Sequence, residues 1–326
     1  MGLMAMVTRR KALIGAFVAG ALLRDRMSFA KASQPQTPVR FQVPPGACDC
    51  HTHIFARPDQ FPYSPHRTYT PETALPEEMA ALLRALGIER VVIVTPSVYG
   101  TDNSATLFGM KARGATARGV AVIDEKTPES DLEAMAAAGV RGIRLNLVTA
   151  GGVDPLVARR QFEMAIDRVR SRHWHIQMYA TLGLISGLRD AMQDSPVPVV
   201  FDHFGGAQAA LGVGQPGFAD LVALVESGRA YVKLSGAYRA SKQAPDYPDV
   251  APLARALIAA NVNRVLWGTD WPHPNTARPP SGRPTDVTPL LQIDDGRLLN
   301  QLAIWAPDPA VRRKILVDNP AKLYGF

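Results

Sequence analysis

His51 and His53 stand two residues apart, directly after a short run that is typical of a β-strand. Because side chains alternate along a strand, both imidazoles should lie on one face. Two neutral imidazoles on one face can bind a metal ion or, without a metal, donate hydrogen bonds to a carbonyl oxygen. A pair of this kind also arises by chance, so its meaning depends on the polar residues that follow other strands.

Seven further runs rich in β-branched residues recur along the chain, separated by helical patterns. The predicted strands cover 90–95, 118–123, 140–146, 174–179, 197–203, 230–235 and 264–270. The predicted helices cover 77–86, 129–138, 158–172, 184–193, 218–226 and 252–260. With the strand before His51, this alternation predicts an α/β fold, a (β/α)₈ TIM barrel. A doubly wound sheet is not expected, because no glycine-rich phosphate motif follows the first strand.

Catalytic groups of such a barrel come from the carboxyl ends of its strands, and polar residues gather there. The candidate catalytic residues are Asp270, His51, His53 and His203. The candidate substrate-binding residues are Ser97, Tyr99, Asn103, Arg144, Tyr179 and Arg239. Arg144 could instead form an ion pair inside the barrel.

The remaining histidines are weaker candidates. His175 begins its strand and should lie at the opposite, structural end of the barrel. His66 and His173 should be solvated, and His273 could either line the cleft or be a turn residue. Cys48 and Cys50, the only cysteines, should be buried free thiols that face away from the histidines, since residues two apart on a strand are poorly placed for a disulfide.

The N-terminal residues have a distinct pattern. Thr8-Arg9-Arg10-Lys11 precedes an apolar run, 12–23, and Ala30-Lys31-Ala32 follows. This pattern predicts a twin-arginine signal over residues 1–32, cleaved near Ser33, and therefore a periplasmic location in a bacterium. An uncleaved amphipathic tail is the alternative. The proline-rich stretch 33–46 is expected to be a linker, followed by one domain over 47–326.

The charge of the chain restricts its partners. Of the formal net charge of +7, a net +5 belongs to residues 1–32. The domain is therefore nearly neutral and lacks a basic stripe, which argues against a nucleic-acid partner. No membrane contact is expected after the signal is removed, and the oligomeric state stays open.

Three separated segments, 49–53, 202–205 and 268–272, resemble motifs of the amidohydrolase superfamily. Within it they are similar to the branch of 2-pyrone-4,6-dicarboxylate lactonases and of sugar-lactone hydrolases and isomerases. Segments 96–103 and 233–239 resemble that branch too, so the likeness extends over the whole domain.

The resemblance implies a hydrolase that opens a lactone of a sugar acid or of an aromatic breakdown product. Asp270 would accept a proton from water, and the three histidines would hold the carbonyl oxygen, directly or through zinc. Arg144 and Arg239 would orient a carboxylate-bearing or hydroxyl-rich substrate. The alternatives are a lactone isomerase, a metal-dependent decarboxylase and a non-catalytic periplasmic binding barrel.

Two departures from the family pattern matter. Metal-dependent members carry a histidine at the end of the fifth strand, where this chain has Tyr179. We therefore expect that no cofactor is required, although His51, His53 and Asp270, with or without His203, could bind Zn²⁺ or another divalent ion. The dicarboxylate enzymes also have a second arginine after the fourth strand, which is missing from 147–152 and argues against a dicarboxylate substrate.

Overall fold

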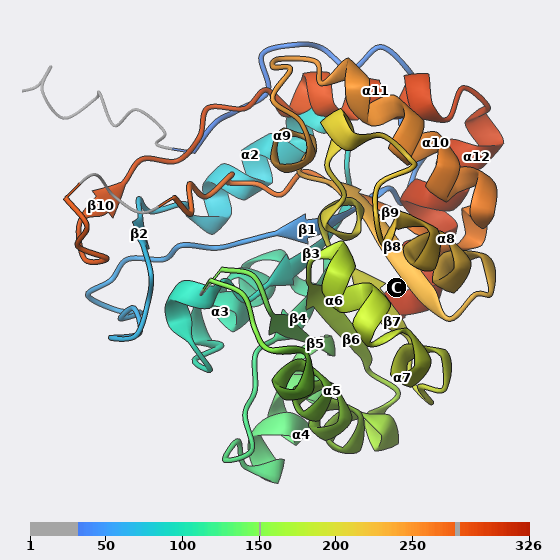
Figure 1. Ribbon diagram of the computed structural model, residues 1–326. Coiled ribbons are helices and arrows are strands. Elements are labelled where there is room, and N and C mark those ends of the chain that lie inside the picture. Colours follow the sequence, from blue (N-terminus) through green and yellow to red (C-terminus); the bar gives the residue numbers. More distant parts are fainter. Residues whose placement is uncertain (1–31, 150, 278–280) are drawn as a thin grey trace, which may run out of the picture. The chain divides into compact units, whose positions relative to one another are not determined.

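The computed structural model describes residues 32–149, 151–277 and 281–326. Eight parallel strands form one sheet in the order β1-β3-β4-β5-β6-β7-β8-β9 (Figure 1). The strands are β1 (Cys48–Thr52), β3 (Arg90–Val94), β4 (Ala117–Ala121), β5 (Val140–Asn146), β6 (His175–Tyr179), β7 (Val199–Phe201), β8 (Ala230–Ser235) and β9 (Val265–Gly268). The predicted α/β barrel is therefore confirmed.

The barrel closes between β9 and β1. The backbone N–H of Asp270 donates to the carbonyl of His51 at 2.9 Å, and the N–H of His53 donates to the carbonyl of Trp271 at 2.8 Å. The Asp49 carboxylate adds hydrogen bonds from the Thr269 N–H at 3.1 Å and from its hydroxyl at 2.6 Å. Closure therefore brings the end of β9 against the histidines of β1.

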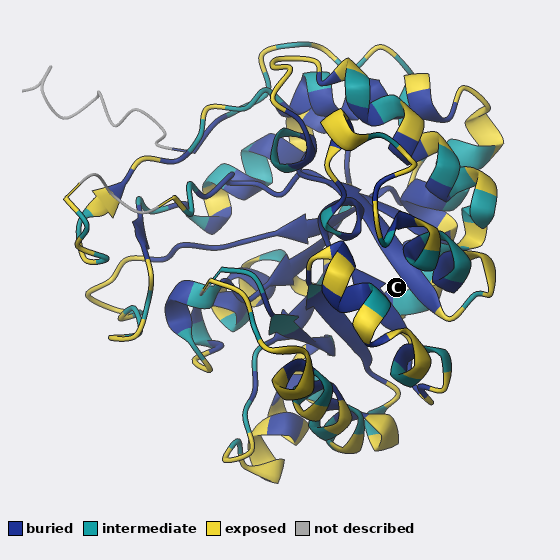
Figure 2. Cartoon of the chain, viewed as in Figure 1, coloured by how far each residue is buried: buried dark blue, intermediate teal, exposed yellow. Residues whose placement is uncertain are grey.

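Helices cover the outside of the barrel and bury one face each (Figure 2). They are α2 (Pro76–Leu86), α3 (Ser104–Arg113), α4 (Glu129–Ala138), α5 (Pro155–Val169), α6 (Leu182–Gly187), α7 (Arg189–Gln193), α8 (Phe218–Glu226), α9 (Ala237–Ala240), α10 (Ala251–Ala260), α11 (Asp295–Trp305), α12 (Pro309–Arg313) and α13 (Asn319–Tyr324).

The helix predicted at 158–172 begins earlier, because the Asp154 carboxylate caps α5 by accepting from two backbone N–H groups. The helix predicted at 184–193 is divided at Leu188.

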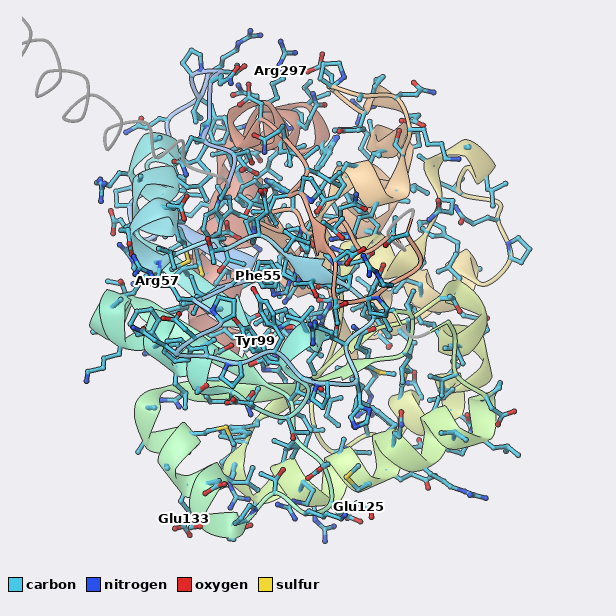
Figure 3. The ribbon with its side chains drawn as sticks, turned by 90° about the vertical axis from the view of Figure 1, so that its left-hand side faces the viewer. Phe55, Arg57, Tyr99, Glu125, Glu133 and Arg297 are labelled. Carbon is cyan, nitrogen blue, oxygen red and sulfur yellow. The ribbon has the colours of Figure 1, made fainter. Side chains whose placement is uncertain are left out.

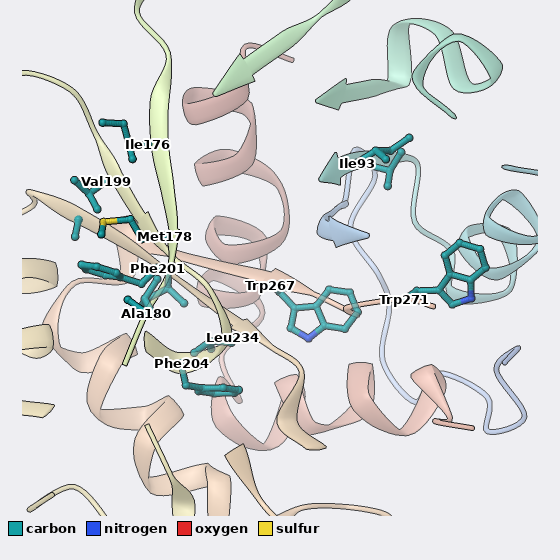
Figure 4. Close-up of a cluster of buried hydrophobic side chains, with 14 of the residues drawn as sticks. Ile93, Ile176, Met178, Ala180, Val199, Phe201, Phe204, Leu234, Trp267 and Trp271 are labelled. Carbon is teal, nitrogen blue, oxygen red and sulfur yellow. The ribbon is translucent and has the colours of Figure 1, made fainter. Parts of the chain in front are cut away.

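The large apolar cluster lies between strands and helices, and Figure 4 shows part of it around Phe201, Phe204 and Trp267. A smaller cluster joins Cys48 and Cys50 to residues of β3, β4, β7, β8 and β9 and to Tyr324. Side chains from opposite strands can meet only inside the barrel, so these thiols line its interior.

The cysteines are buried and free, but the prediction that they face away from the histidines is wrong. The register of β1 against β3 shifts between Asp49 and Thr52, which marks a β-bulge. The extra residue breaks the alternation of side chains. Cys50 and His51 consequently both point inward.

The stretch 33–46, predicted as a linker, has irregular backbone but lies against the domain. Thr37 donates its hydroxyl to Asp294 at 2.6 Å, and the Trp271 indole donates to the carbonyl of Ser33 at 3.1 Å. The compact unit extends from Ala32 to Phe326. The predicted signal lies outside the described residues except for Ala32.

A small parallel pair, β2 (Thr70–Pro71) and β10 (Val287–Thr288), joins two long loops outside the barrel. Within the described ranges, no helix is long and apolar enough to cross a membrane.

Candidate active site

The four candidate catalytic residues meet at the carboxyl ends of β1, β7 and β9. Oδ1 of Asp270 lies 3.5 Å from Nε2 of His53, 3.6 Å from Nε2 of His51 and 3.9 Å from Nε2 of His203. All four side chains are buried. Three imidazoles therefore surround one carboxylate oxygen, which has no hydrogen-bond partner among the described residues.

Unusual backbone conformations place these side chains. His203 has φ of 49° and Asp270 has φ of 67°, in the left-handed region that residues with a Cβ rarely adopt. These two conformations turn the chain, so β7 and β9 end earlier than the strands predicted at 197–203 and 264–270. A Cβ at Gly236 would lie 2.9 Å from Nδ1 of His203, so the chain needs glycine there. Strain of this kind is typical of functional sites.

The other oxygen of Asp270, Oδ2, is held by two residues of the turn that follows β8. It accepts hydrogen bonds from Nε of Arg239 at 2.5 Å and from the Tyr238 hydroxyl at 2.6 Å. Burial alone would raise the pKa of Asp270, but the charge of Arg239 holds this pKa well below its usual range. Asp270 is therefore a fixed carboxylate with one free oxygen.

The three imidazoles are neutral near pH 7. Burial lowers the pKa of His51 and His53, and lowers that of His203 to about 4. Nδ1 of His53 lies 2.7 Å from the carbonyl of Val94 and must donate its proton to it. Neutral His53 consequently presents a lone pair, not an N–H, to Asp270.

Beneath this cluster lies a buried network around Asp202. Its Oδ2 accepts from Nε of Arg144 and from Nε2 of Gln177, both at 3.1 Å. The Lys233 ammonium donates to Oε1 of Gln177 at 2.6 Å and lies 3.5 Å from Oδ1 of Asp202. Although burial raises the pKa of Asp202, the charges near it hold the pKa well below its ordinary value.

Arg144 combines the two roles that the sequence left open. Its Nε forms the interior ion pair with Asp202, while its terminal nitrogens make no hydrogen bond with the described residues. With Ser97 and Asn146 it lines a cavity of about 440 Å³. Its guanidinium also lies 5.5 Å from the ring of Tyr179. A cation with free donors at a cavity is suited to an anionic group.

A second, smaller cavity of about 120 Å³ lies beside the imidazoles. His203, Tyr179 and Arg239 line it, and the Tyr179 ring stands edge-on to His203 at 5.2 Å. The structure therefore brings Tyr179 and Arg239 to the edge of the catalytic cluster and Arg144 to the network beneath it, while Ser97 lines the larger cavity.

Tyr99 and Asn103, two of the predicted substrate-binding residues, make contacts that hold the fold. The short helical turn Ser97–Tyr99 directs Tyr99 into the core, where its hydroxyl accepts from the N–H of Ala56 at 3.0 Å; Figure 3 shows it near Phe55. The Asn103 amide joins the ends of two strands by accepting from Thr95 and from the N–H of Val122, both at 2.8 Å. Neither residue lines the two cavities described above, but Asn103 lines an adjoining cavity that shares Asp124 and Lys126 with the larger one.

The other histidines divide as follows. His175 is buried at the start of β6, as predicted, and His66 and His173 are exposed. His273 lies in a turn, where its N–H donates to the carbonyl of Asp270 at 2.9 Å, but it is buried, and its Nε2 lies 3.0 Å from Oδ2 of Asp295. Its ring packs edge-on against Tyr238, which contacts Asp270.

The sequence interpretation missed four polar residues that hold the site: Asp202, Gln177, Lys233 and Tyr238. Lys233 carried a signal, because it interrupts a strand whose neighbours are apolar and fully buried. A charge at such a position is rarely tolerated without a buried partner. Tyr238 carried none, since a tyrosine after a strand is common.

Atoms that could bind a cation meet in the same cluster. His51, His203 and Asp270 each offer one ligand atom, and these atoms lie within 4.8 Å of one another. Nε2 of His51 and Oδ1 of Asp270 are buried without a partner, so the donor set fits a divalent ion. This group contains His203 in place of His53 from the predicted set.

Comparison with known proteins places these residues in a family context. The family model described as Amidohydrolase matches residues 48–326. A 4-sulfomuconolactone hydrolase of Rhizobium radiobacter is 38% identical over 288 residues, which cover 88% of this chain and 93% of the relative. A 2-pyrone-4,6-dicarboxylate hydrolase of Comamonas testosteroni is 35% identical over 91% of this chain and 94% of its own length.

One relative has a different activity, and one solved structure extends the likeness to the fold. A D-galactarolactone isomerase of Agrobacterium fabrum is 31% identical over 86% of this chain and 91% of its own length. A protein of Agrobacterium tumefaciens, solved in its apo form, superposes with a TM-score of 0.74 at 28% identity and covers 90% of this chain and 98% of its own.

Proposed function

Because the chain belongs to the amidohydrolase family, we propose that it is a hydrolase that opens the lactone ring of an organic acid. The observation that carries the proposal is the free Oδ1 of Asp270, surrounded by three neutral imidazoles. This arrangement offers a proton acceptor and hydrogen-bond donors within one cluster. Those are the groups that ester hydrolysis requires.

In the proposed reaction, Oδ1 of Asp270 accepts a proton from the attacking water. The water oxygen bonds to the carbonyl carbon, the ring C–O bond breaks, and the proton passes to the departing alkoxide. Since His53 presents a lone pair beside Asp270, it orients the water and is not a carbonyl donor. His51 and His203 remain to donate to the carbonyl oxygen as negative charge develops on it.

The charges of the site favour an anionic substrate. Two carboxylates, Asp202 and Asp270, face three cations, Arg144, Lys233 and Arg239. With neutral imidazoles, one positive charge of this cluster is left without a counterpart; the wall of the larger cavity beyond it adds Asp124, Glu125 and Lys126. We propose that a single carboxylate or sulfonate of the lactone binds the free nitrogens of Arg144 in the 440 Å³ cavity.

We also propose that turnover requires no divalent cation. The existing excess of positive charge disfavours a further cation, and Arg239 already pairs with Asp270. Tyr179 stands at the strand end where metal-dependent relatives carry a histidine, and a neutral phenol is a poor ligand. If a cation binds, His51, His203 and Asp270 would hold it, and it would polarise the carbonyl as a Lewis acid.

The setting of the reaction is proposed from the sequence. Residues 1–32 support twin-arginine export to the periplasm. The partner is then a small-molecule lactone in that compartment, with neither a nucleic acid nor a membrane involved.

A lactone panel tests the proposal. Purified protein would be mixed with lactones of sugar acids and of aromatic breakdown products in weakly buffered indicator, with an Asp270→Asn variant as control. Stoichiometric proton release together with ring opening is the expected result, because the new carboxylic acid, with a pKa of about 4, is fully ionised at pH 7. Product formation without proton release would replace hydrolysis by isomerisation, as in the galactarolactone relative. Failure to open any lactone would overturn the proposal.

A further inference from the structure

A basic cavity lies at the end of the barrel opposite to the active site. Its volume is about 330 Å³, and its walls come from the beginnings of β6, β7, β8 and β9. His175 begins β6, residues 195–198 precede β7, Tyr231 is the second residue of β8, and Arg264 directly precedes β9. Because the catalytic cluster lies at the carboxyl ends of the strands, this cavity is a separate site.

Three cations line this cavity: Arg229, Arg264 and Lys322. Arg264 is fixed, because its Nε donates to the carbonyl of Gly228 at 2.9 Å. Arg229 follows Gly228 directly, and α13 carries Lys322 to the rim. No described Asp or Glu lines the cavity, and none of the three cations forms an ion pair within the described chain. Their charges are therefore not offset by neighbouring side chains.

Two buried polar side chains add hydrogen-bond donors. The Tyr231 hydroxyl accepts from Arg264 at 3.1 Å, and no described residue accepts its own proton. His175 is buried on the cavity wall, and neither ring nitrogen has a partner among the described residues. Burial lowers the pKa of His175 to about 3, so the ring is neutral and carries one N–H. Buried donors without a protein partner normally bind water or a ligand.

These groups suit a phosphate group. A dianion offsets two of the three positive charges, whereas a monoanion offsets only one, so the cluster favours the dianion. Arginine binds phosphate oxygens through parallel N–H groups, and lysine adds a point charge. The volume has room for the free ion with water or for a small phosphate ester.

We infer that this cavity binds a phosphate group, either of inorganic phosphate or of a small phosphate ester, between Arg229, Arg264 and Lys322. The inference does not depend on the proposed hydrolysis, because none of these residues belongs to the active site.

Calorimetric titration of the purified protein tests the inference. Inorganic phosphate, glycerol 3-phosphate and acetate would be titrated separately at pH 7.5, at equal ionic strength set by sodium chloride. We expect saturable binding of a phosphate group and no comparable binding of acetate, and the tighter of the two phosphate compounds identifies the source. Phosphate should also raise the melting temperature as its concentration increases. If the wild type shows no saturable phosphate binding, or binds acetate equally well, the inference is wrong.

Variants locate the bound phosphate. Arg229→Gln and Lys322→Gln each remove an exposed charge whose side chain makes no hydrogen bond within the described chain. Each should raise Kd for phosphate about tenfold, as expected for one charge-assisted hydrogen bond. Lys111→Gln, at an exposed lysine of α3, is the matched control and should bind phosphate like the wild type.

Arg144→Gln separates this cavity from the active site. Phosphate binding should survive this change, because Arg144 lines only the cavity beside the catalytic residues. Binding that is lost in Arg144→Gln but kept in Arg229→Gln would place the phosphate in the active site and overturn the inference. Equal weakening in Lys111→Gln and Lys322→Gln would reduce the effect to general attraction of anions, and would overturn it too.

Discussion

The Tyr238 hydroxyl donates a hydrogen bond of 2.6 Å to Oδ2 of Asp270. Together with Arg239 it occupies that oxygen and leaves Oδ1 to the imidazoles. One carboxylate is thereby divided into an anchored oxygen and a free one. His273, paired with Asp295, packs behind the Tyr238 ring and supports it.

The free oxygen should carry the proton transfer. Replacing Asp270 by Asn keeps the shape of the side chain but removes its basicity, so kcat should fall by about two orders of magnitude or more. Substrate binding should survive, as checked by calorimetry with the unreacted lactone. Tyr238→Phe is the matched control, since it removes only the anchor and should cost less. Near-normal turnover in Asp270→Asn would reduce this residue to an orienting role.

Arg239 should set the acid limit of activity. Burial favours protonation of Asp270, and the guanidinium is the main charge that keeps its pKa low. In Arg239→Met this pKa should rise, so that the rate is lost at a higher pH on the acid side and recovers toward alkaline pH. Profiles of kcat/KM from pH 4 to 9 would show the shift. An unmoved acid limb would mean that another group controls it.

Arg144 should determine affinity for the acidic group of the substrate. Loss of a charged hydrogen bond in Arg144→Gln should raise KM for an anionic lactone by roughly 10- to 100-fold. KM for a neutral lactone should change little, which separates recognition from a general disturbance of Asp202. Equal effects on both lactones would assign Arg144 to structure alone.

Chelation should leave the enzyme active. Elemental analysis of the purified protein and assays after exhaustive treatment with chelator would measure the requirement. The charge balance of the site predicts full activity without added metal. Stoichiometric zinc, with activity lost on chelation and restored by zinc, would show that His51, His203 and Asp270 act as ligands.

Export should depend on the paired arginines. Replacing Arg9 and Arg10 by lysine keeps the charge but removes the feature that the twin-arginine route recognises. Unprocessed precursor should then accumulate in the cytoplasm, as seen by fractionation and mass measurement. Normal recovery of processed protein from the periplasm would exclude this route.

Much of the site could be predicted from local sequence, because a barrel places the ends of all its strands at one edge. The positions of His51, His53, His203 and Asp270 at strand ends were enough to expect their convergence. The family could also be predicted, since its motifs are short and contiguous. Strand ends and contiguous motifs can both be recognised in local sequence, without any long-range contact.

Only the tertiary structure decided the roles of individual atoms. The bulge in β1 turned Cys50 inward together with His51, against the alternation of a regular strand. The turn after β3 directed Tyr99 into the core, and the network of Asp202, Gln177 and Lys233 joins three strands. Hydrogen bonds between residues far apart in sequence fix which nitrogen carries a proton and which oxygen stays free. Their geometry is set by packing around the barrel, so residue types and spacing could not reveal it.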